Sequence, residues 1–232
     1  MQLPALWFFK KDPDIGFKFG EALVQDASLG VHNTRDLLEA EFDLRDTTGD
    51  PDGPWPETYP RPVAALPDWP FAPDFWTFGR LEFASRRLRD ALAQPGEVVQ
   101  VLPFDLVRAS AAARAQDYRW MRVLARQEAL DLARCECRIK ERRHAVTGKL
   151  VRFPSNVDFF ALRENLVPLT EIFRLDESPT YILVTDAVAE RVLRAGCTGM
   201  EFSDPANRQS GKRVVRYRTA DGIAERRIGF LD

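Results

Sequence analysis

The chain of 232 residues has few of the side chains that form structural zinc sites or disulfides, with three cysteines and two histidines. An odd, small number of cysteines argues against a disulfide scaffold and favours a reducing compartment. No His-x-x-x-His or Cys-x-x-Cys spacing is present, so the sequence predicts no zinc site, and nothing in it indicates another cofactor. Cys135 and Cys137 would share one face of a strand, where we interpret them as small hydrophobic side chains.

Long apolar runs are also missing. No stretch approaches the roughly 20 apolar residues that a membrane helix needs. The apolar segment Leu3–Phe9 lacks the basic start, the length and the cleavage site of a secretory signal. Because 45% of the residues are hydrophobic and 29% are charged, the chain can build a packed core. We therefore expect a cytoplasmic protein with no membrane partner.

Motifs for catalysis are absent as well. No serine lies in a Gly-x-Ser-x-Gly turn, and no Gly-x-Gly-x-x-Gly is present. The segment Thr147-Gly148-Lys149 resembles the end of a phosphate-binding loop, but Arg143 stands where the first glycine is needed and Leu150 follows the lysine. We predict that the protein is not an enzyme. Catalytic groups can converge in space rather than in sequence, so an enzyme of unidentified chemistry stays an alternative.

Charge is distributed unevenly, although the net charge is only −2. Residues 1–79 carry six basic and 14 acidic side chains, a net charge of −8, while residues 80–232 carry 27 and 21, a net charge of +6. Acidic residues are densest over 36–57, and basic residues over 208–227. The two ends could neutralise each other, or one face could steer a charged partner. The total argues against nucleic acid as a partner, and a nucleic-acid-binding module in the basic half is a further alternative.

Proline marks out one segment of the chain. Half of the 16 prolines lie between Pro51 and Pro73, which blocks regular helix and predicts an extended loop. More aromatic side chains lie in and just after this segment than a disordered linker carries: Trp55, Tyr59, Trp69, Phe71, Phe75, Trp76 and Phe78. We interpret the segment as a loop packed onto the core. An aromatic recognition surface is the alternative.

A weak internal repeat appears beyond residue 80, with a spacing of 100 residues. In each copy a hydroxyl residue, Ser85 or Thr185, caps a predicted helix with apolar residues at i, i+4 and i+8. Each helix runs toward a glycine, Gly96 or Gly196, and each glycine leads to a strand. These strands are predicted over 98–104 and 200–202. The repeat predicts two related strand–helix–strand units.

The rest of the chain is predicted to be mainly strand. Alternation and short apolar runs predict strands at 3–9, 118–124, 130–139, 150–153, 157–162, 172–175 and 181–184. A short helix is predicted over 35–41, and a hairpin with an Asp-Gly turn over 213–228. Together these elements predict an α+β fold: one central, mixed and largely antiparallel sheet with helices on one face.

By composition, the chain divides into three parts. Residues 1–79 form an acidic N-terminal subregion with the proline- and aromatic-rich loop. Residues 80–205 form the core, and residues 206–232 form a basic C-terminal hairpin extension.

Three places in the sequence carry a family resemblance. They are Phe83–Leu92, with its hydroxyl and charged residues before an apolar helix; Tyr118–Leu124, followed by Ala129-Leu130-Asp131; and Ile172–Leu175 with Tyr181–Thr185, closing at Gly199-Met200-Glu201-Phe202. In order and spacing, residues from about 75 to 205 resemble a family of bacterial immunity proteins of polymorphic-toxin systems, formerly a domain of unknown function. The proline-rich segment is longer than the family leads us to expect.

This resemblance implies a cytoplasmic protein that has no chemistry of its own. It would bind and neutralise a cognate toxin or secreted effector, encoded by the adjacent gene. Nanomolar binding corresponds to about −12 kcal/mol and requires aromatic anchors and complementary charge. The acidic stretch would suit the basic cleft of a nuclease toxin. The predicted partner-binding residues are Asp43, Asp46, Asp50, Asp52, Trp55, Glu57, Tyr59 and Trp69.

Overall fold

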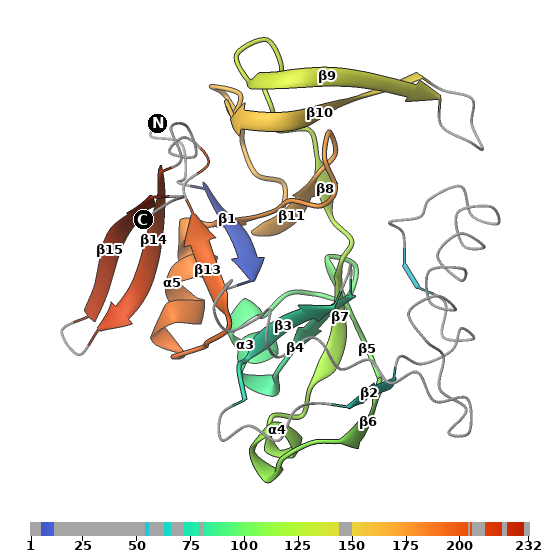
Figure 1. The fold of residues 1–232 in the computed structure, drawn as a ribbon, viewed down its shortest axis with the longest axis vertical. Coiled ribbons are helices and arrows are strands. Elements are labelled where there is room, and N and C mark those ends of the chain that lie inside the picture. The colour runs from blue at the N-terminus through green and yellow to red at the C-terminus, as the bar shows by residue number, and fades with distance from the viewer. Residues whose placement is uncertain are drawn as a thin grey trace. The chain divides into compact units, whose positions relative to one another are not determined.

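The structure is a computed structural model (Figure 1). It describes residues 6–11, 54–55, 63–65, 72–78, 81–143, 150–203, 205, 212–219 and 222–229. These residues form largely antiparallel sheets and short helices, which confirms the predicted α+β class. Within these ranges, no helix has the length and apolar character needed to cross a membrane.

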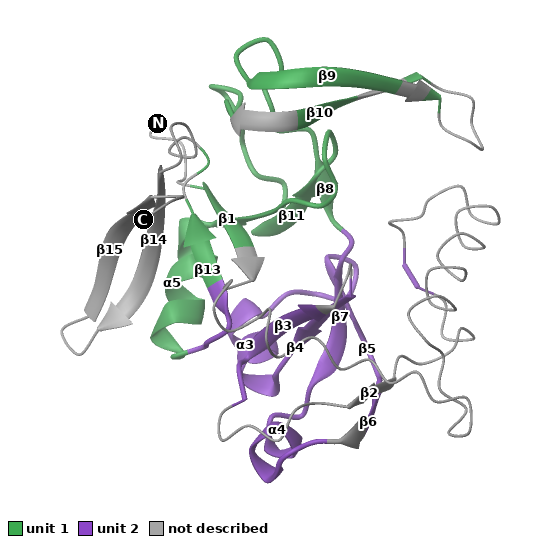
Figure 2. Ribbon diagram, in the orientation of Figure 1, with its two compact units in different colours: residues 1–10, 125–196, 201–232 green, residues 11–124, 197–200 purple. Residues whose placement is uncertain are grey.

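The chain folds into two compact units, each assembled from separate segments (Figure 2). Unit 1 contains residues 1–10, 125–196 and 201–232, and unit 2 contains residues 11–124 and 197–200. These limits differ from the divisions at 79 and 205, because charge and proline content do not report which strands share a sheet. The three-part division by composition stays a prediction.

Unit 2 is built on a four-stranded antiparallel sheet with the order β3-β4-β7-β5. Its strands are β3 (Phe75–Phe78), β4 (Leu81–Ala84), β5 (Val99–Leu102) and β7 (Arg119–Val123). Strands β3 and β4 form a hairpin, and β7 pairs with both β4 and β5. The strands predicted at 98–104 and 118–124 are confirmed.

Two helices and a small parallel sheet complete the described part of unit 2. They are α3 (Arg86–Leu92), α4 (Ala111–Ala115), β2 (Val63–Ala65) and β6 (Asp105–Arg108). Both helices begin at a serine cap: Ser85 Oγ accepts from Leu88 N at 3.1 Å, and Ser110 Oγ accepts from Ala113 N at 3.2 Å. The cap at Ser85 was predicted. Helix α4 was missed because a five-residue, alanine-rich helix is too short to show an apolar period.

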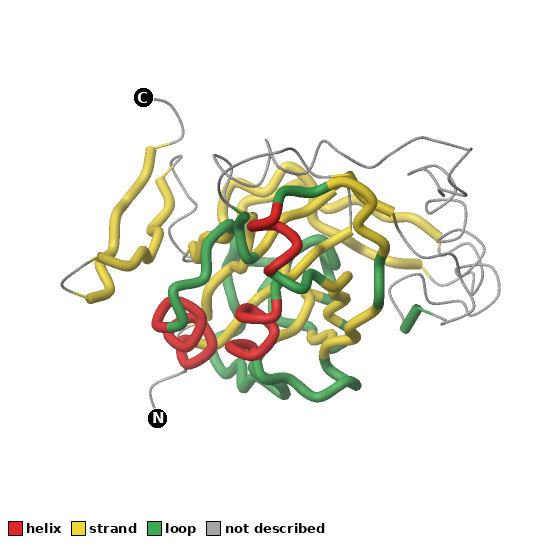
Figure 3. The backbone as a smooth tube through the Cα atoms, turned by 90° about the horizontal axis from the view of Figure 1, so that it is seen from below, coloured by secondary structure: helices red, strands yellow, loops and turns green. Residues whose placement is uncertain are grey.

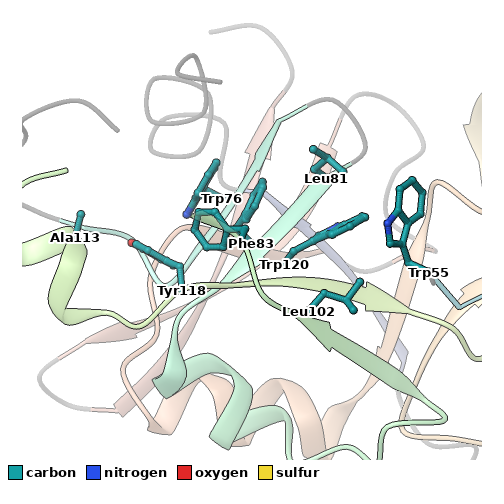
Figure 4. Packing of buried hydrophobic residues seen from close by; sticks show 9 residues of the cluster. Trp55, Trp76, Leu81, Phe83, Leu102, Ala113, Tyr118 and Trp120 are labelled. Atoms are coloured by element: carbon teal, nitrogen blue, oxygen red, sulfur yellow. The ribbon is translucent and has the colours of Figure 1, made fainter. Parts of the chain in front are cut away.

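The core of unit 2 is mainly aromatic (Figure 4). Trp76 lies opposite Phe83 across the hairpin, and Phe83 lies opposite Trp120, so the three side chains share one face of the sheet. The Trp76 and Phe83 rings stack with 3.9 Å between centroids, and both are buried. Truncating a ring of this kind costs about 3–5 kcal/mol. The other members of the cluster are Trp55, Leu81, Leu102, Phe104, Ala113 and Tyr118.

Unit 1 is built on a seven-stranded sheet with the order β15-β14-β13-β1-β12-β11-β8. Its strands are β1 (Leu6–Lys11), β8 (Arg126–Gln127), β11 (Ile172–Leu175), β12 (Ile182–Thr185), β13 (Met200–Ser203), β14 (Lys212–Thr219) and β15 (Gly222–Gly229). The N-terminal strand β1 lies between β12 and β13. Strands β14 and β15 form the predicted hairpin, although Asp221 of its turn lies outside the described residues.

Helix α5 (Asp186–Arg194) packs against β12 and β14 of this sheet, and Figure 3 shows the helices in red among the yellow strands. Strand β1 is joined to the start of α5 because Trp7 Nε1 donates to Asp186 Oδ1 at 2.8 Å. Phe8, which is fully buried, packs edge-on against Phe160 with 4.9 Å between ring centroids. A separate two-stranded ribbon, β9 (Glu136–Arg143) and β10 (Leu150–Phe159), completes the described part of unit 1.

The single central sheet expected from the sequence is wrong, because the strands are shared between two main sheets. Segment β4-α3-β5 contributes to the sheet of unit 2, and β12-α5-β13 to that of unit 1. In each segment the two strands are separated by a strand from elsewhere in the chain, β7 or β1. In the two sheets, β3 and β11 occupy matching places, β4 and β12 follow them, and β7 and β1 are the inserted strands that precede β5 and β13. Periodicity predicts the elements but does not encode which distant strand lies between them.

Candidate partner-binding site

Of the eight predicted partner-binding residues, the structure describes Trp55. The other seven, Asp43, Asp46, Asp50, Asp52, Glu57, Tyr59 and Trp69, lie outside the described residues, as does the helix predicted over 35–41. Trp55 is 3% exposed, so its ring is part of the core of unit 2 and is not presented to a partner. At this position the proline-rich segment is a loop packed onto the core.

The backbone of Trp55 is held by Gln100 in β5. The side-chain amide of Gln100 accepts from the Trp55 N–H at 2.7 Å and donates to the Trp55 carbonyl oxygen at 2.8 Å. These two bonds reproduce, with a side chain, the pair that a residue of a neighbouring antiparallel strand would exchange. Residue 55 is therefore attached through both of its backbone polar groups.

The ring of Trp55 is held by two side chains of β7. It packs edge-on against Trp120 with 4.9 Å between centroids, and the Arg122 guanidinium lies 5.1 Å from the Trp55 ring and 5.7 Å from that of Trp120. The register pairs Gln100 with Arg122 and Leu102 with Trp120, so these side chains share one face. We call Trp55, Gln100, Trp120 and Arg122 the Trp55 clasp.

Sequence reasoning missed Gln100 and Arg122. Alternation in each strand places Gln100 with Leu102, and Arg122 with Trp120, on a common side. Only the register between β5 and β7 shows that the two pairs face each other.

Polar side chains also converge around Asp74, which is 1% exposed. Its carboxylate accepts from Ser85 Oγ at 2.6 Å and from Thr198 N and Oγ1 at 2.9 and 3.3 Å. Arg87 Nη1 lies 3.8 Å from Asp74 Oδ2. These contacts join the residues before β3, the cap of α3 and the segment 197–200 into one unit.

The electrostatics of this cluster do not favour catalysis. Cys197 is 9% exposed, and its burial together with the charge of Asp74 raises the pKa of its thiol to about 12. Burial likewise raises the pKa of Tyr118, whose hydroxyl donates to the carbonyl oxygen of Pro73. A thiol and a phenol that keep their protons at neutral pH are poor nucleophiles and bases. We interpret the Asp74 cluster as a structural link within unit 2.

The other two cysteines are free, half-buried thiols at the start of the β9–β10 ribbon. Burial raises the pKa of both Cys135 and Cys137, and Ala161 N donates to Cys135 Sγ at 3.3 Å. In the part of the chain that the structure describes, no three or more His, Cys, Asp or Glu side chains form a group that could hold a metal ion.

Comparison with protein-family models decides the family. The model of an immunity protein family, Imm11, matches residues 16–207. The chain belongs to the Imm11 immunity protein family. This confirms the resemblance noted over residues 75–205 and extends it toward the N-terminus. A comparison with curated proteins gives no match.

The limits of the Imm11 match bear on where the candidate site lies. The acidic stretch 36–57 and the Trp55 clasp lie inside the matched range of 16–207, although the resemblance had started at about residue 75. The hairpin β14–β15 begins at Lys212, beyond the match. The N-terminal candidate residues therefore belong to the region shared with the Imm11 family.

A second surface of this Imm11 protein was not predicted. Val167 and Leu169, in a loop of unit 1, are 67% and 80% exposed. The loop is fixed by Gln127 of β8, which donates to the Val167 carbonyl oxygen at 2.8 Å and accepts from Leu169 N at 2.9 Å. Exposed apolar side chains on a fixed backbone are common at protein contacts. From the sequence, a Leu-Val-Pro-Leu run cannot be distinguished from a core segment.

Proposed function

We propose that this protein binds a cognate bacterial toxin or secreted effector and neutralises it by covering part of its surface. The observation that carries the proposal is the match to the Imm11 immunity family over residues 16–207. Immunity proteins in general act by binding and not by catalysis. The protein would act in the cytoplasm of the producing cell, and the adjacent gene is the first candidate for the toxin gene.

The acidic stretch is the surface that we propose for the toxin. Residues 36–57 carry eight carboxylates and a single basic side chain, Arg45. Such a density of one charge speeds association with a surface of opposite charge and disfavours nucleic acid. Asp52 and Glu57 lie three and two residues in the sequence from Trp55, whose own ring is part of the core of unit 2. A toxin with a basic cleft, such as a nuclease, fits this surface best.

Co-expression tests the function. The product of the neighbouring gene is expressed from an inducible promoter, with and without this protein. We expect growth to stop when the neighbour is expressed alone and to resume when both are present. Purified protein should also inhibit the purified neighbour at an equimolar ratio. A neighbour that stays toxic in the presence of folded protein would refute the proposal for this pair.

A further inference from the structure

We propose that residues 167–169 of unit 1, which we call the apolar loop, form a second contact with the toxin and enter an uncharged, apolar pocket on its surface. The loop belongs to the connection between β10 and β11 (Figure 2). It is separate in the sequence from the acidic stretch 36–57, and the structure describes all of it. The inference rests on the proposed function for the identity of the partner.

The apolar loop presents two large aliphatic side chains to solvent. Leu169 is 80% exposed and Val167 is 67% exposed, more than any other large hydrophobic side chain in the described part of the chain. The two residues are separated by a single proline, so one pocket on another protein can cover both. Transfer of such side chains from water into an apolar pocket is favourable, and the protein itself covers neither.

The backbone of the apolar loop is fixed on both sides of Pro168. Just before the loop, Leu166 is 7% exposed and belongs to the core of unit 1. The side-chain amide of Gln127 then holds the carbonyl oxygen of Val167 and the N–H of Leu169. Proline adds its own restriction on φ. A loop that is already ordered loses little conformational entropy when a partner binds, which favours its use as an anchor.

The charged residues next to the apolar loop identify the kind of partner. Residues 163–171 contain three charged side chains, and each of them pairs with an opposite charge. The pairs are Arg163–Glu128 at 2.8 Å, Glu164–Arg134 at 2.6 Å and Glu171–Arg191 at 2.7 Å. Three positive and three negative charges cancel, so this surface has no field of one sign to attract a nucleic acid. Apolar side chains beside paired charges instead match the apolar centre and polar rim of a protein–protein interface.

A second copy of this chain fits the apolar loop less well than a toxin does. A side chain that is 80% exposed lies on a convex part of the surface. A two-fold dimer through this loop would place the same convex surface against itself. The Imm11 match includes residues 167–169, and the proposed function requires a different protein as the partner. The toxin is therefore the occupant that we propose.

The test compares Leu169→Asp with Leu150→Asp. Leu150 of β10 is a 52% exposed leucine outside the apolar loop, and both substitutions add one negative charge. Leu169→Ala shortens the side chain without adding charge. Gln127→Ala removes both bonds to the loop backbone and keeps the two exposed side chains. Thermal unfolding of each variant checks that it is folded.

The readout is the dissociation rate of the complex with the neighbouring gene's product, inactivated in its own active site. We expect dissociation to be at least about tenfold faster for Leu169→Asp and to change by less than about twofold for Leu150→Asp. Leu169→Ala and Gln127→Ala should give smaller changes in the same direction. Because the contact is apolar, the effect of Leu169→Ala should be the same at low and high salt.

The possible outcomes separate the loop contact from the proposed function. Wild-type binding with equal dissociation rates for folded Leu169→Asp and Leu150→Asp would overturn the loop contact alone. No binding by the wild type would overturn the proposed function for this pair, and with it the toxin as the occupant of the loop. Sedimentation velocity of the protein alone tests the second copy. A wild-type dimer that becomes a monomer in Leu169→Asp would overturn the toxin as the occupant and assign the loop to self-association.

Discussion

Gly199 shows how a single backbone position holds unit 2 together. Its φ is +90°, and a Cβ at this position would overlap the carbonyl oxygen of Phe75 and lie 2.7 Å from Pro73 Cβ. We expect Gly199→Ala to lower the free energy of unfolding by about 3 kcal/mol or more, because a backbone oxygen cannot move aside. Urea denaturation measures this. Gly96→Ala is the control, with nothing within 4 Å of the added methyl, and should change stability by less than about 1 kcal/mol.

Cys197 makes stability fall at alkaline pH. Its folded pKa is about 12, above the ordinary value of 9.0, so between these values the unfolded thiol loses its proton while the folded thiol keeps it. The unfolded state then binds fewer protons, and stability decreases with rising pH by up to about 1.4 kcal/mol per unit. We expect Cys197→Ala to lose less stability than the wild type between pH 8 and pH 10. The free energy of unfolding of both proteins is measured by urea denaturation at each pH. Equal losses for the wild type and Cys197→Ala would contradict this expectation.

At the scale of residues, the local role of a side chain could be predicted from the sequence better than whether that side chain is buried or exposed. The sequence identified Ser85 as a helix cap, and the structure confirms it with a bond from Leu88 N. It identified Trp55 as a candidate contact, whereas the ring is buried. Composition and proline content mark an aromatic segment but do not tell which rings enter the core. The burial of Trp55 involves contacts with Gln100 and Arg122, and these two residues lie side by side because β5 pairs with β7.

At the scale of elements, the two repeated helices differ in their caps. Ser85 Oγ accepts from Leu88 N and donates to Asp74 Oδ1, while Thr185 makes no side-chain bond to the start of α5. We expect Ser85→Ala to cost about 1–2 kcal/mol and Thr185→Ala less than about 0.5 kcal/mol. Thermal unfolding of the two variants checks this. Equal losses would show that the bonds of Ser85 add nothing to stability.

The exposed loop of unit 1 offers a matched pair of leucines. Leu169 is 80% exposed and Leu166 is 7% exposed, three residues away. Leu169→Asp should change stability by less than about 0.5 kcal/mol, while Leu166→Asp should cost several kcal/mol because it buries a carboxylate in the core. Chemical denaturation measures both. A large loss for Leu169→Asp would mean that this side chain packs against the protein in solution.

The sequence patterns that predicted individual strands could not predict which distant strands pair with each other. Alternation and caps located β5, β7, β11, β12 and the β14–β15 hairpin, since each is a local pattern. The insertion of β1 between β12 and β13 joins residues about 180 apart, and no local pattern specifies it. Two sheets therefore appear where the sequence indicated one.

At the scale of the whole molecule, the order of the strands explains why each unit is discontinuous. Unit 1 takes its central strand from the N-terminus, and unit 2 takes residues 197–200 from the C-terminal half. The Asp74 carboxylate and the close approach at Gly199 hold that last segment in unit 2. Cutting the chain at a composition boundary would separate parts of one sheet. The family match covers residues 16–207, a range that includes segments of both units.

Charge reversal in the acidic segment tests whether the uneven charge of the molecule speeds its association with a toxin. Changing Asp43, Asp46 and Asp50 to Lys shifts the net charge from −2 to +4. If this segment meets a basic toxin surface, association at low salt should slow by at least about tenfold, and its dependence on salt should weaken. The control reverses Asp90, Glu97 and Glu164, three exposed acidic residues that change the net charge by the same amount. The association rates of both triple variants are measured by stopped flow at several salt concentrations, with the neighbouring gene's product inactivated in its own active site. They show whether the position of the charges or only the net charge sets the rate. Equal slowing by both triple variants would mean that only the total charge matters, and an unchanged rate for the first would remove residues 43–50 from the interface.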